Sequence, residues 1–222
     1  MAAPESLDVV QELSRFMNEG GIFMWVILAM WITGLVISIE RFFSLMVLNT
    51  RGAKLLNDVH RFLLTNNIQA AVSLCSKSKS ALARVLKVGL KRINKSKDYI
   101  EHSMMTSILE VSPKIDKRMN YLGLIANVST LVGLLGTIYG LIESFAAVAG
   151  ADPTQKSKLL ALGISKAMNT TAFGLISAIS IMCIHTVLTG TVDKIYNDLD
   201  EFPSKFINLI ASKGFEEEDE AA

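Results

Sequence analysis

Two threonines and two oppositely charged residues lie in the longest apolar stretches of this chain. Thr137 and Glu143 belong to one stretch, and Lys166 and Thr171 belong to the following one. Threonine hydroxyls donate and accept hydrogen bonds without the cost of burying a charge, so they can hold water beside a titrating group. These residue types indicate either a polar seam that lines an ion path or plain close packing of two helices.

Small residues accompany the polar ones at helical spacing. Thr130, Thr137 and Glu143 alternate with glycines at steps of three or four, a spacing that we interpret as one helix face. Small residues allow helix backbones to approach closely in lipid, where the hydrophobic effect does not drive helix association. We predict that the helices pack through Gly133, Gly136, Gly140, Gly174 and Ala178.

Three apolar stretches have the length of a membrane span. No charged side chain occurs from Ile22 to Ile39 or from Met119 to Ile142, and only His185 could carry a charge from Ala167 to Val192. About 20 apolar residues suffice to cross a bilayer. Hydrophobic residues make up 50% of the chain, which is high for a soluble domain. The predicted fold class is therefore an all-α integral membrane protein with three transmembrane helices and long helical extensions.

Basic residues are concentrated between the first and second spans. Residues 49–118 contain 14 basic and five acidic side chains, so the positive-inside rule places this region in the cytoplasm and the N-terminus outside. Amphipathic sets near residues 55–63, 68–75 and 82–93 predict helices there. No aromatic platform accompanies the basic residues, and solvated helix faces explain them better than nucleic-acid binding.

These patterns divide the chain into segments. An interfacial N-terminal helix is expected in 1–21, with a long helix near 98–118 that bends at Pro113 and a C-terminal helix that Pro203 breaks. The other predicted segments are the transmembrane helices at 22–48, 119–149 and 159–192, the cytoplasmic domain at 49–118, the external turn at 150–158, the cytoplasmic C-terminal helix at 193–215 and a disordered acidic tail at 216–222.

Residues suited to catalysis or metal binding do not form a pattern. Cys75 and Cys183 are far apart, so we expect free thiols. The three histidines lack the spacing of a ligand set, and neither a phosphate loop nor a nucleophile with its base is present. The sequence predicts no enzyme, no metal and no cofactor.

A set of motifs occurs in one order along nearly the whole chain. It comprises Gly20-Gly21 before a tryptophan-containing first span, Glu40-Arg41 at the end of that span, Ala81 to Leu90, Gly133-x-x-Gly136-Thr137-x-x-Gly140, and Gly163 to Ala167 followed by Thr171-x-x-Gly174-Leu175. This ordered set resembles the ExbB/TolQ branch of the MotA/TolQ/ExbB proton-channel family. Three spans rather than four favour ExbB/TolQ over MotA.

The resemblance implies a homopentamer in the inner membrane of a Gram-negative bacterium. In this family the second and third spans surround single-span helices of an ExbD/TolR-like partner whose transmembrane aspartate carries the proton. Threonines that match Thr137 and Thr171 line the path, and we include the neighbouring Thr170. Proton flow then drives work on a periplasmic or outer-membrane effector. A ring of the same fold that only scaffolds its partner is the alternative.

Three residues depart from the family pattern. The family usually has a glutamate where this chain has Lys166, and prolines where it has Thr130 and Ser180. At about 1.5 Å per residue, Glu143 lies roughly 9 Å outward of Thr137, and Lys166 lies roughly 7.5 Å outward of Thr171. We therefore predict an ion pair between Glu143 and Lys166 near the pore, within or between subunits. The alternative is that Lys166 extends to the interface and Glu143 is solvated.

Overall fold

The computed structural model describes residues 11, 14, 16–18, 20–49, 52–65 and 67–220, with side chains up to residue 210. Within these ranges the chain is almost entirely α-helical and contains no strand. Three helices are long and apolar enough to cross a membrane. The all-α class with three spans is confirmed, while residues 1–10 of the expected N-terminal helix lie outside the described residues.

The chain divides into two compact units, and α2 (Ile22–Leu48) and α8 (Pro153–Glu220) contribute to both. The first unit, which we call the membrane unit, comprises Met1–Ile39 and Arg118–Thr186. The second, which we call the polar unit, comprises Glu40–Lys117 and Val187–Ala222.

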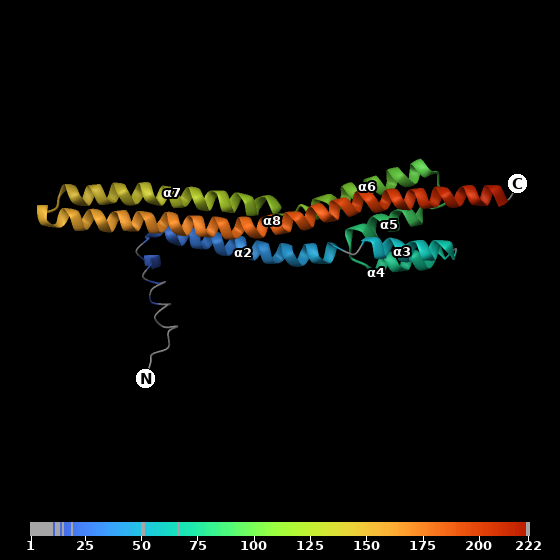
Figure 1. Cartoon of the computed structure of the whole chain (residues 1–222), viewed down its shortest axis with the longest axis horizontal. Helices are drawn as coiled ribbons and strands as arrows, with labels where there is room; N and C mark the ends of the chain where they lie inside the picture. The colour runs from blue at the N-terminus through green and yellow to red at the C-terminus, as the bar shows by residue number, and fades with distance from the viewer. Residues whose placement is uncertain are drawn as a thin grey trace, which may run out of the picture. The chain divides into compact units, whose positions relative to one another are not determined.

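The membrane unit is built on an antiparallel pair of helices. α7 (Met119–Ala149) and the first part of α8 run side by side and are joined by a short turn (Figure 1). The first part of α2 packs against both, because a Cβ atom built at Gly34 would lie 2.7 Å from Ile181 Cδ1 and 3.5 Å from Ile125 Cγ2. The glycine at this crossing lets α2 approach closely without a shift of the Ile181 side chain.

The turn between α7 and α8 is shorter than the sequence predicted. We expected a turn over 150–158, but α8 already begins at Pro153. The Asp152 carbonyl accepts hydrogen bonds from the backbone N–H groups of Gln155 and Lys156, at 2.9 and 3.2 Å. Proline is favourable at the first position of a helix because its missing N–H would have no helical partner there. The prediction took the polar residues after Gly150 as a loop, whereas they form the first turn of α8.

The polar unit contains α3 (Gly52–Leu64), α4 (Ile68–Lys77), α5 (Ala81–Lys91) and α6 (Lys97–Ile115). The first three coincide with the amphipathic stretches of the sequence. Side-chain caps set two of their starts: Asn67 Oδ1 accepts from the Ala70 N–H at 3.1 Å, and Ser80 Oγ accepts from the Ala83 N–H at 3.2 Å.

Large apolar side chains form the core of the polar unit. Leu86 of α5, Met104 of α6 and Phe206 of α8 are each no more than 1% exposed. A Cβ atom at Gly89 would lie 2.6 Å from Met104 Sδ and 2.8 Å from Phe206 Cε1. The glycine therefore allows α5 to contact α6 and α8 together.

A break separates α6 from α7, whereas the sequence predicted one bent helix. Pro113 lies within the last turn of α6, and Arg118 adopts a left-handed conformation with φ 60°. This conformation ends the helical path before α7 starts at Met119. There is therefore no continuous helix for Pro113 to bend. The left-handed conformation of Arg118 separates α6 from α7.

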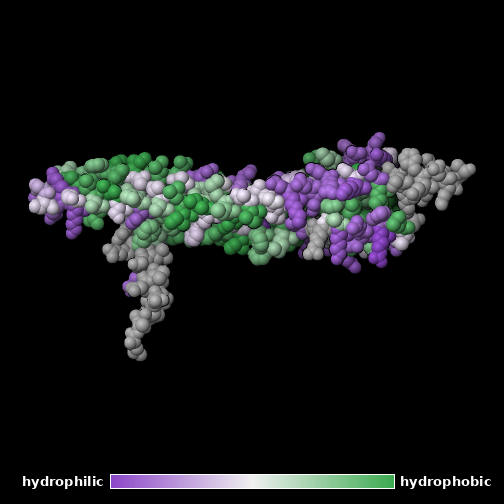
Figure 2. Space-filling view, in the orientation of Figure 1, coloured by the Kyte–Doolittle hydropathy of each residue, from purple (hydrophilic) through white to green (hydrophobic). Residues whose placement is uncertain are grey.

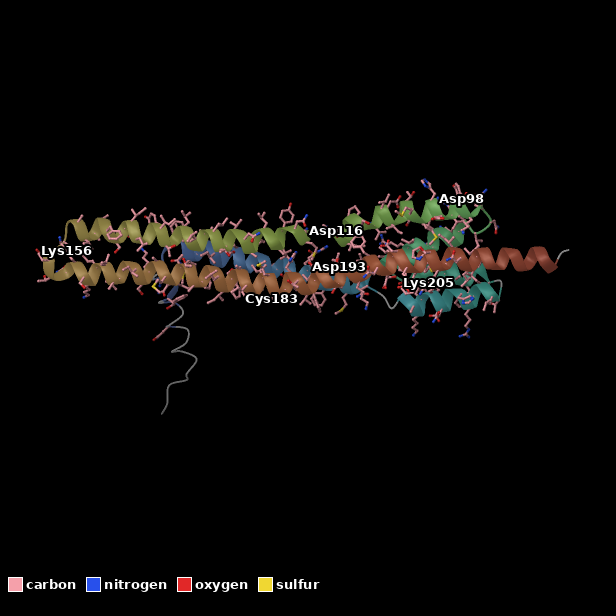
Figure 3. All side chains as sticks on the ribbon, turned by 45° about the horizontal axis from the view of Figure 1, so that its top comes forward. Asp98, Asp116, Lys156, Cys183, Asp193 and Lys205 are labelled. Carbon is pink, nitrogen blue, oxygen red and sulfur yellow. The ribbon has the colours of Figure 1, made fainter. Side chains whose placement is uncertain are left out.

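Arg41 of α2 stabilises the end of α6. Its guanidinium is 2% exposed and donates to the Lys117 carbonyl at 2.8 Å and to Glu40 Oε1 at 2.7 Å. Tyr196 of α8 donates to Asp116 Oδ2 at 2.6 Å, and burial together with this bond raises the Tyr196 pKa. Figure 3 labels Asp116 at this end of α6. Arg41 thus satisfies a backbone carbonyl that the break leaves without a helical partner, and Tyr196 binds the Asp116 side chain beside it.

The prediction that Pro203 breaks the C-terminal helix was wrong. α8 continues through Pro203 to Glu220, and Phe202, Pro203 and Phe206 are buried in the polar unit. Burial of these side chains offsets the cost of about 3 kcal/mol that an interior proline imposes on a helix. The backbone is also helical over residues 216–220, where we predicted disorder, and glutamate is a good helix former.

Candidate functional site

The two helices of the antiparallel pair meet along a seam of small residues. A Cβ atom at Gly133 would lie 3.2 Å from Gly174 Cα, and one at Gly140 would lie 3.3 Å from Ala167 Cα. These contacts are made with backbone atoms, so a larger side chain could not be accommodated by a change of rotamer. Ala178 is also buried, at 4% exposure. Gly133, Gly140 and Gly174 therefore lie where α7 and α8 approach each other, as Gly136 also does against Thr170.

The threonine pair bridges this seam. Thr171 Oγ1 of α8 donates to the Gly133 carbonyl of α7 at 2.9 Å and lies 3.5 Å from Thr137 Oγ1. Thr137 in turn donates to the Leu134 carbonyl of its own helix. Both hydroxyl protons have backbone acceptors, so both oxygens keep lone pairs that can accept a hydrogen bond from water or from a protonated acid.

Thr170 does not join the threonine pair. It is 1% exposed, and its single hydroxyl proton has two backbone acceptors, the Lys166 carbonyl at 3.0 Å and the Gly20 carbonyl at 3.3 Å. A Cβ atom at Gly136 would lie 2.4 Å from Thr170 Cγ2 and 3.5 Å from Phe23 Cβ. Thr170 therefore faces the start of α2, inside the bundle.

Glu143 and Lys166 form an ion pair within one chain. Lys166 Nζ lies 2.7 Å from Glu143 Oε2, with side chains 33% and 54% exposed. The hypothesis of an ion pair, drawn from the matching levels of the two residues, thus agrees with the structure. Gly21, with φ +71°, lies against the lysine, and a Cβ atom there would approach Lys166 Cε to 3.2 Å. The positive φ and the close approach both favour glycine at this turn.

The ion pair and the threonine pair lie on different sides of the seam. At about 100° per residue, Glu143 is turned about 120° from Thr137, and Lys166 about 140° from Thr171. The contacts agree with this difference, because Lys166 faces the turn before α2 whereas Thr171 faces Gly133. The sequence analysis placed Thr137 and Glu143 on one helix face, because steps of three and four residues each add a small rotation that short spacings hide.

Sequence reasoning missed two buried hydroxyls and one bond between spans. Ser129 and Ser177 are at most 1% exposed, and their Oγ atoms have no hydrogen-bond partner among the described residues. Trp31 of α2 donates to Ser180 Oγ of α8 at 2.8 Å. A serine within an apolar stretch indicates that a polar contact is possible there. Its spacing in the sequence does not show which other helix supplies the partner.

A metal site is not apparent in the part of the chain that the structure describes. No group of three or more histidine, cysteine, aspartate or glutamate side chains lies close enough to hold a metal ion there. The chemistry of the seam therefore rests on its hydroxyls, its backbone carbonyls and the ion pair.

Comparison with known proteins identifies the family. The model of the MotA/TolQ/ExbB proton channel family matches residues 77–201, more than half of the chain. The chain belongs to this family. The matched region includes both threonines, the ion pair and the α7–α8 seam, whereas α2 and the Gly20-Gly21 turn precede it.

Individual relatives include both TolQ and ExbB proteins. The chain is 31% identical to the Tol-Pal system protein TolQ of Haemophilus influenzae over 46% of its own length and 44% of that protein. It is 37% identical to the biopolymer transport protein exbB1 of Vibrio cholerae over 41% of the chain and 40% of that protein. The chain thus aligns with less than half of either relative. It is 24% identical to a putative ExbB-like 3 protein of Synechocystis, over 84% of the chain and 96% of that protein.

Proposed function

We propose that this chain is a subunit of a proton-driven motor. Copies of it form a ring, as a homopentamer, around an ExbD/TolR-like single-span protein with an aspartate in its span. Proton flow through the ring is coupled to work in the periplasm or at the outer membrane. In this proposal the chain spans the bacterial inner membrane three times, with its N-terminus in the periplasm and its C-terminus in the cytoplasm.

The threonine pair is the observation that carries this proposal. Thr137 and Thr171 lie 3.5 Å apart on two facing spans, and each is bound to a backbone carbonyl in a way that leaves its oxygen able to accept. Such oxygens suit a partner carboxylic acid that carries its proton past them, because the acid is neutral in that state and needs an acceptor. The two spans contain no aspartate or glutamate from Met119 to Ile142 or from Ala167 to Val192, so in this proposal the partner supplies the titrating group.

The position of the ion pair bears on the alternative of a non-conducting scaffold ring. A cation at Lys166 would repel protons if it stood beside the threonines. In the structure its charge is paired with Glu143 at 2.7 Å and faces the start of α2. Lys166 therefore does not oppose conduction along the threonine side, and we favour the motor over the scaffold.

Proton uptake into vesicles tests this function. The chain is purified from its native membrane with the single-span protein that accompanies it, and both are reconstituted with a pH-sensitive dye inside. We expect uptake in the unmodified complex and its loss in Thr137→Val and Thr171→Val, which keep the side-chain shape but remove the hydroxyl. Thr33→Val is the matched control, since Thr33 is an exposed span residue bound only to its own helix at the Ala29 carbonyl.

Two outcomes would contradict the proposal. An assembled complex without uptake above that of empty vesicles would support the scaffold ring. Normal uptake in both threonine variants would show that protons take another route.

A further inference from the structure

A groove with acidic walls lies between α6 and α8 in the polar unit. It has a volume of about 560 Å³, and the exposed Asp98, Glu101 and Asp200 line it together with buried Met104 and Leu199. Figure 3 labels Asp98 near the start of α6. Among the described residues that line the groove, none is lysine or arginine. The groove thus combines an apolar floor with negative charge.

The exposed lining of the groove suits particular side chains. Its carboxylates favour ligands that bring several N–H groups, and Met105, which is 56% exposed, provides an apolar surface beside them. Lysine and arginine side chains fit, because their alkyl stems can pack on Met105 while their charged ends meet the carboxylates.

The same unit carries a complementary surface on α5. Arg84, Lys87 and Lys91 follow one another at steps of three and four, and Arg84 and Lys91 are exposed. We call these three residues the basic stripe. Leu82 and Leu86 are buried on the other side of α5, so the stripe faces outward.

The basic stripe cannot reach the groove of its own chain. α5 contacts Met104 of α6 and Phe206 of α8 through Gly89, on the helix side opposite to the stripe. The groove is lined by α6 and α8 without any residue of α5. The two surfaces therefore lie on opposite sides of this group of three helices.

We propose that the groove between α6 and α8 binds the basic stripe of a second copy of this chain. The inference rests on the ring in the proposed function and names the surfaces that join its neighbours. A contact between two different surfaces is heterologous, and such contacts form a closed ring when the rotation between neighbours closes, as the ring of the proposed function requires. Opposite charges on the two surfaces also fix the orientation of neighbouring copies.

Chemical cross-linking of the full chain in its solubilised native assembly tests this contact. Glu101→Cys and Lys87→Cys are combined in a Cys183→Ser chain and treated with a short bis-maleimide. A linker is used because the Cβ atoms of a Lys–Glu pair lie farther apart than the about 4 Å of a disulfide. We expect a ladder of multimers that requires both cysteines. The native Cys75 is buried, and burial raises its pKa to about 11, so it should react much more slowly than the introduced cysteines.

A matched pair provides the control. Glu101→Cys combined with Lys54→Cys, an exposed residue of α3, should give no ladder. The contact would be overturned if the control gave the same ladder, or if Glu101→Cys and Lys87→Cys gave none although both cysteines react with a monofunctional maleimide. Cross-linking of Glu101→Cys to a different protein would also overturn it, because a partner would then occupy the groove.

Charge reversal gives a second, independent measurement. Asp98→Lys with Glu101→Lys and Asp200→Lys should weaken assembly, and Arg84→Glu with Lys87→Glu and Lys91→Glu should do the same. The six changes together should restore the assembled mass measured by native mass spectrometry. Failure of this rescue in a folded protein would contradict the contact. Proton uptake by the unmodified complex, measured separately, distinguishes this failure from failure of the proposed function.

Discussion

The contact between α7 and α8 in the membrane unit is made by small residues, whereas large side chains fill the core of the polar unit. Gly133 meets Gly174 in the membrane unit, whereas Leu86, Met104 and Phe206 fill the core of the polar unit. The outer surfaces show the reverse. Leu131 of α7 is 62% exposed, and Leu64 is the one large hydrophobic residue exposed on the described parts of α3, α4 and α5. Figure 2 shows the corresponding apolar and hydrophilic surfaces.

This contrast reflects the solvent of each unit. In water, burial of large apolar side chains drives folding at about 25 cal/mol per Å². In lipid, large apolar side chains lose nothing by facing outward, and helices gain from close backbone contact instead. The α7–α8 contact and the core of the polar unit therefore use residues of opposite size.

Gly174→Leu should have the largest effect on stability among the changes that test this contrast. A Cβ atom at Gly174 would lie 2.9 Å from the Ser129 carbonyl oxygen and 3.0 Å from Gly133 Cα. Because these are backbone atoms, we expect a loss at or above the upper end of the about 1–3 kcal/mol that overpacking costs, and loss of the folded membrane unit. Gel filtration and circular dichroism in detergent measure this. Gly123→Leu on α7 is the control, because nothing lies within 4 Å of its Cβ position.

Shortening a leucine should affect the two units differently. Leu86→Ala in the polar unit leaves a cavity at a fully buried site and should cost about 2–5 kcal/mol. Leu131→Ala in the membrane unit removes an exposed side chain and should change stability by less than about 0.5 kcal/mol. Denaturant unfolding of the detergent-solubilised chain compares them. Equal losses in both variants would contradict the contrast.

Arg41→Lys should have an intermediate effect. Arg41 donates to the Lys117 carbonyl and to Glu40 at once, and a lysine ammonium cannot reproduce this planar arrangement. A buried acceptor left without its donor costs about 1–3 kcal/mol. Hydrogen exchange near the end of α6 should increase. Unchanged protection there in the variant would show that the break between α6 and α7 does not depend on Arg41.

The smallest effect concerns the reactivity of Cys75. Burial raises the Cys75 pKa from 9.0 to about 11, so at pH 8 roughly one thiol in a thousand is ionised. Since the thiolate is the nucleophile, alkylation should be slow at pH 8 and should accelerate as pH rises towards 11. Mass spectrometry after iodoacetamide treatment measures the rate. Ser73→Cys in a Cys75→Ala chain provides an exposed control on the same helix and should react rapidly at pH 8.

Several features of the fold could be predicted from local pattern. The apolar stretches correctly predicted three helices long enough to cross a membrane, and the amphipathic stretches correctly predicted α3, α4 and α5. The predictions at Pro113, Pro203 and the 150–158 turn were less successful. Pro113 was predicted to bend a helix, Pro203 to break one and residues 150–158 to form a turn. At Pro203 the outcome depends on packing against neighbouring helices that no local window contains.

The sequence by itself determined which residues are small, polar or charged in each span, and their spacing set the levels at which Glu143 meets Lys166 and Thr137 meets Thr171. Only the tertiary structure decided the side of the seam on which each pair lies, the burial of Thr170 against Gly20 and the role of Arg41. The physical reason is that rise along a helix is fixed by backbone geometry, whereas the rotation of one helix against another is fixed by packing with residues far away in the chain.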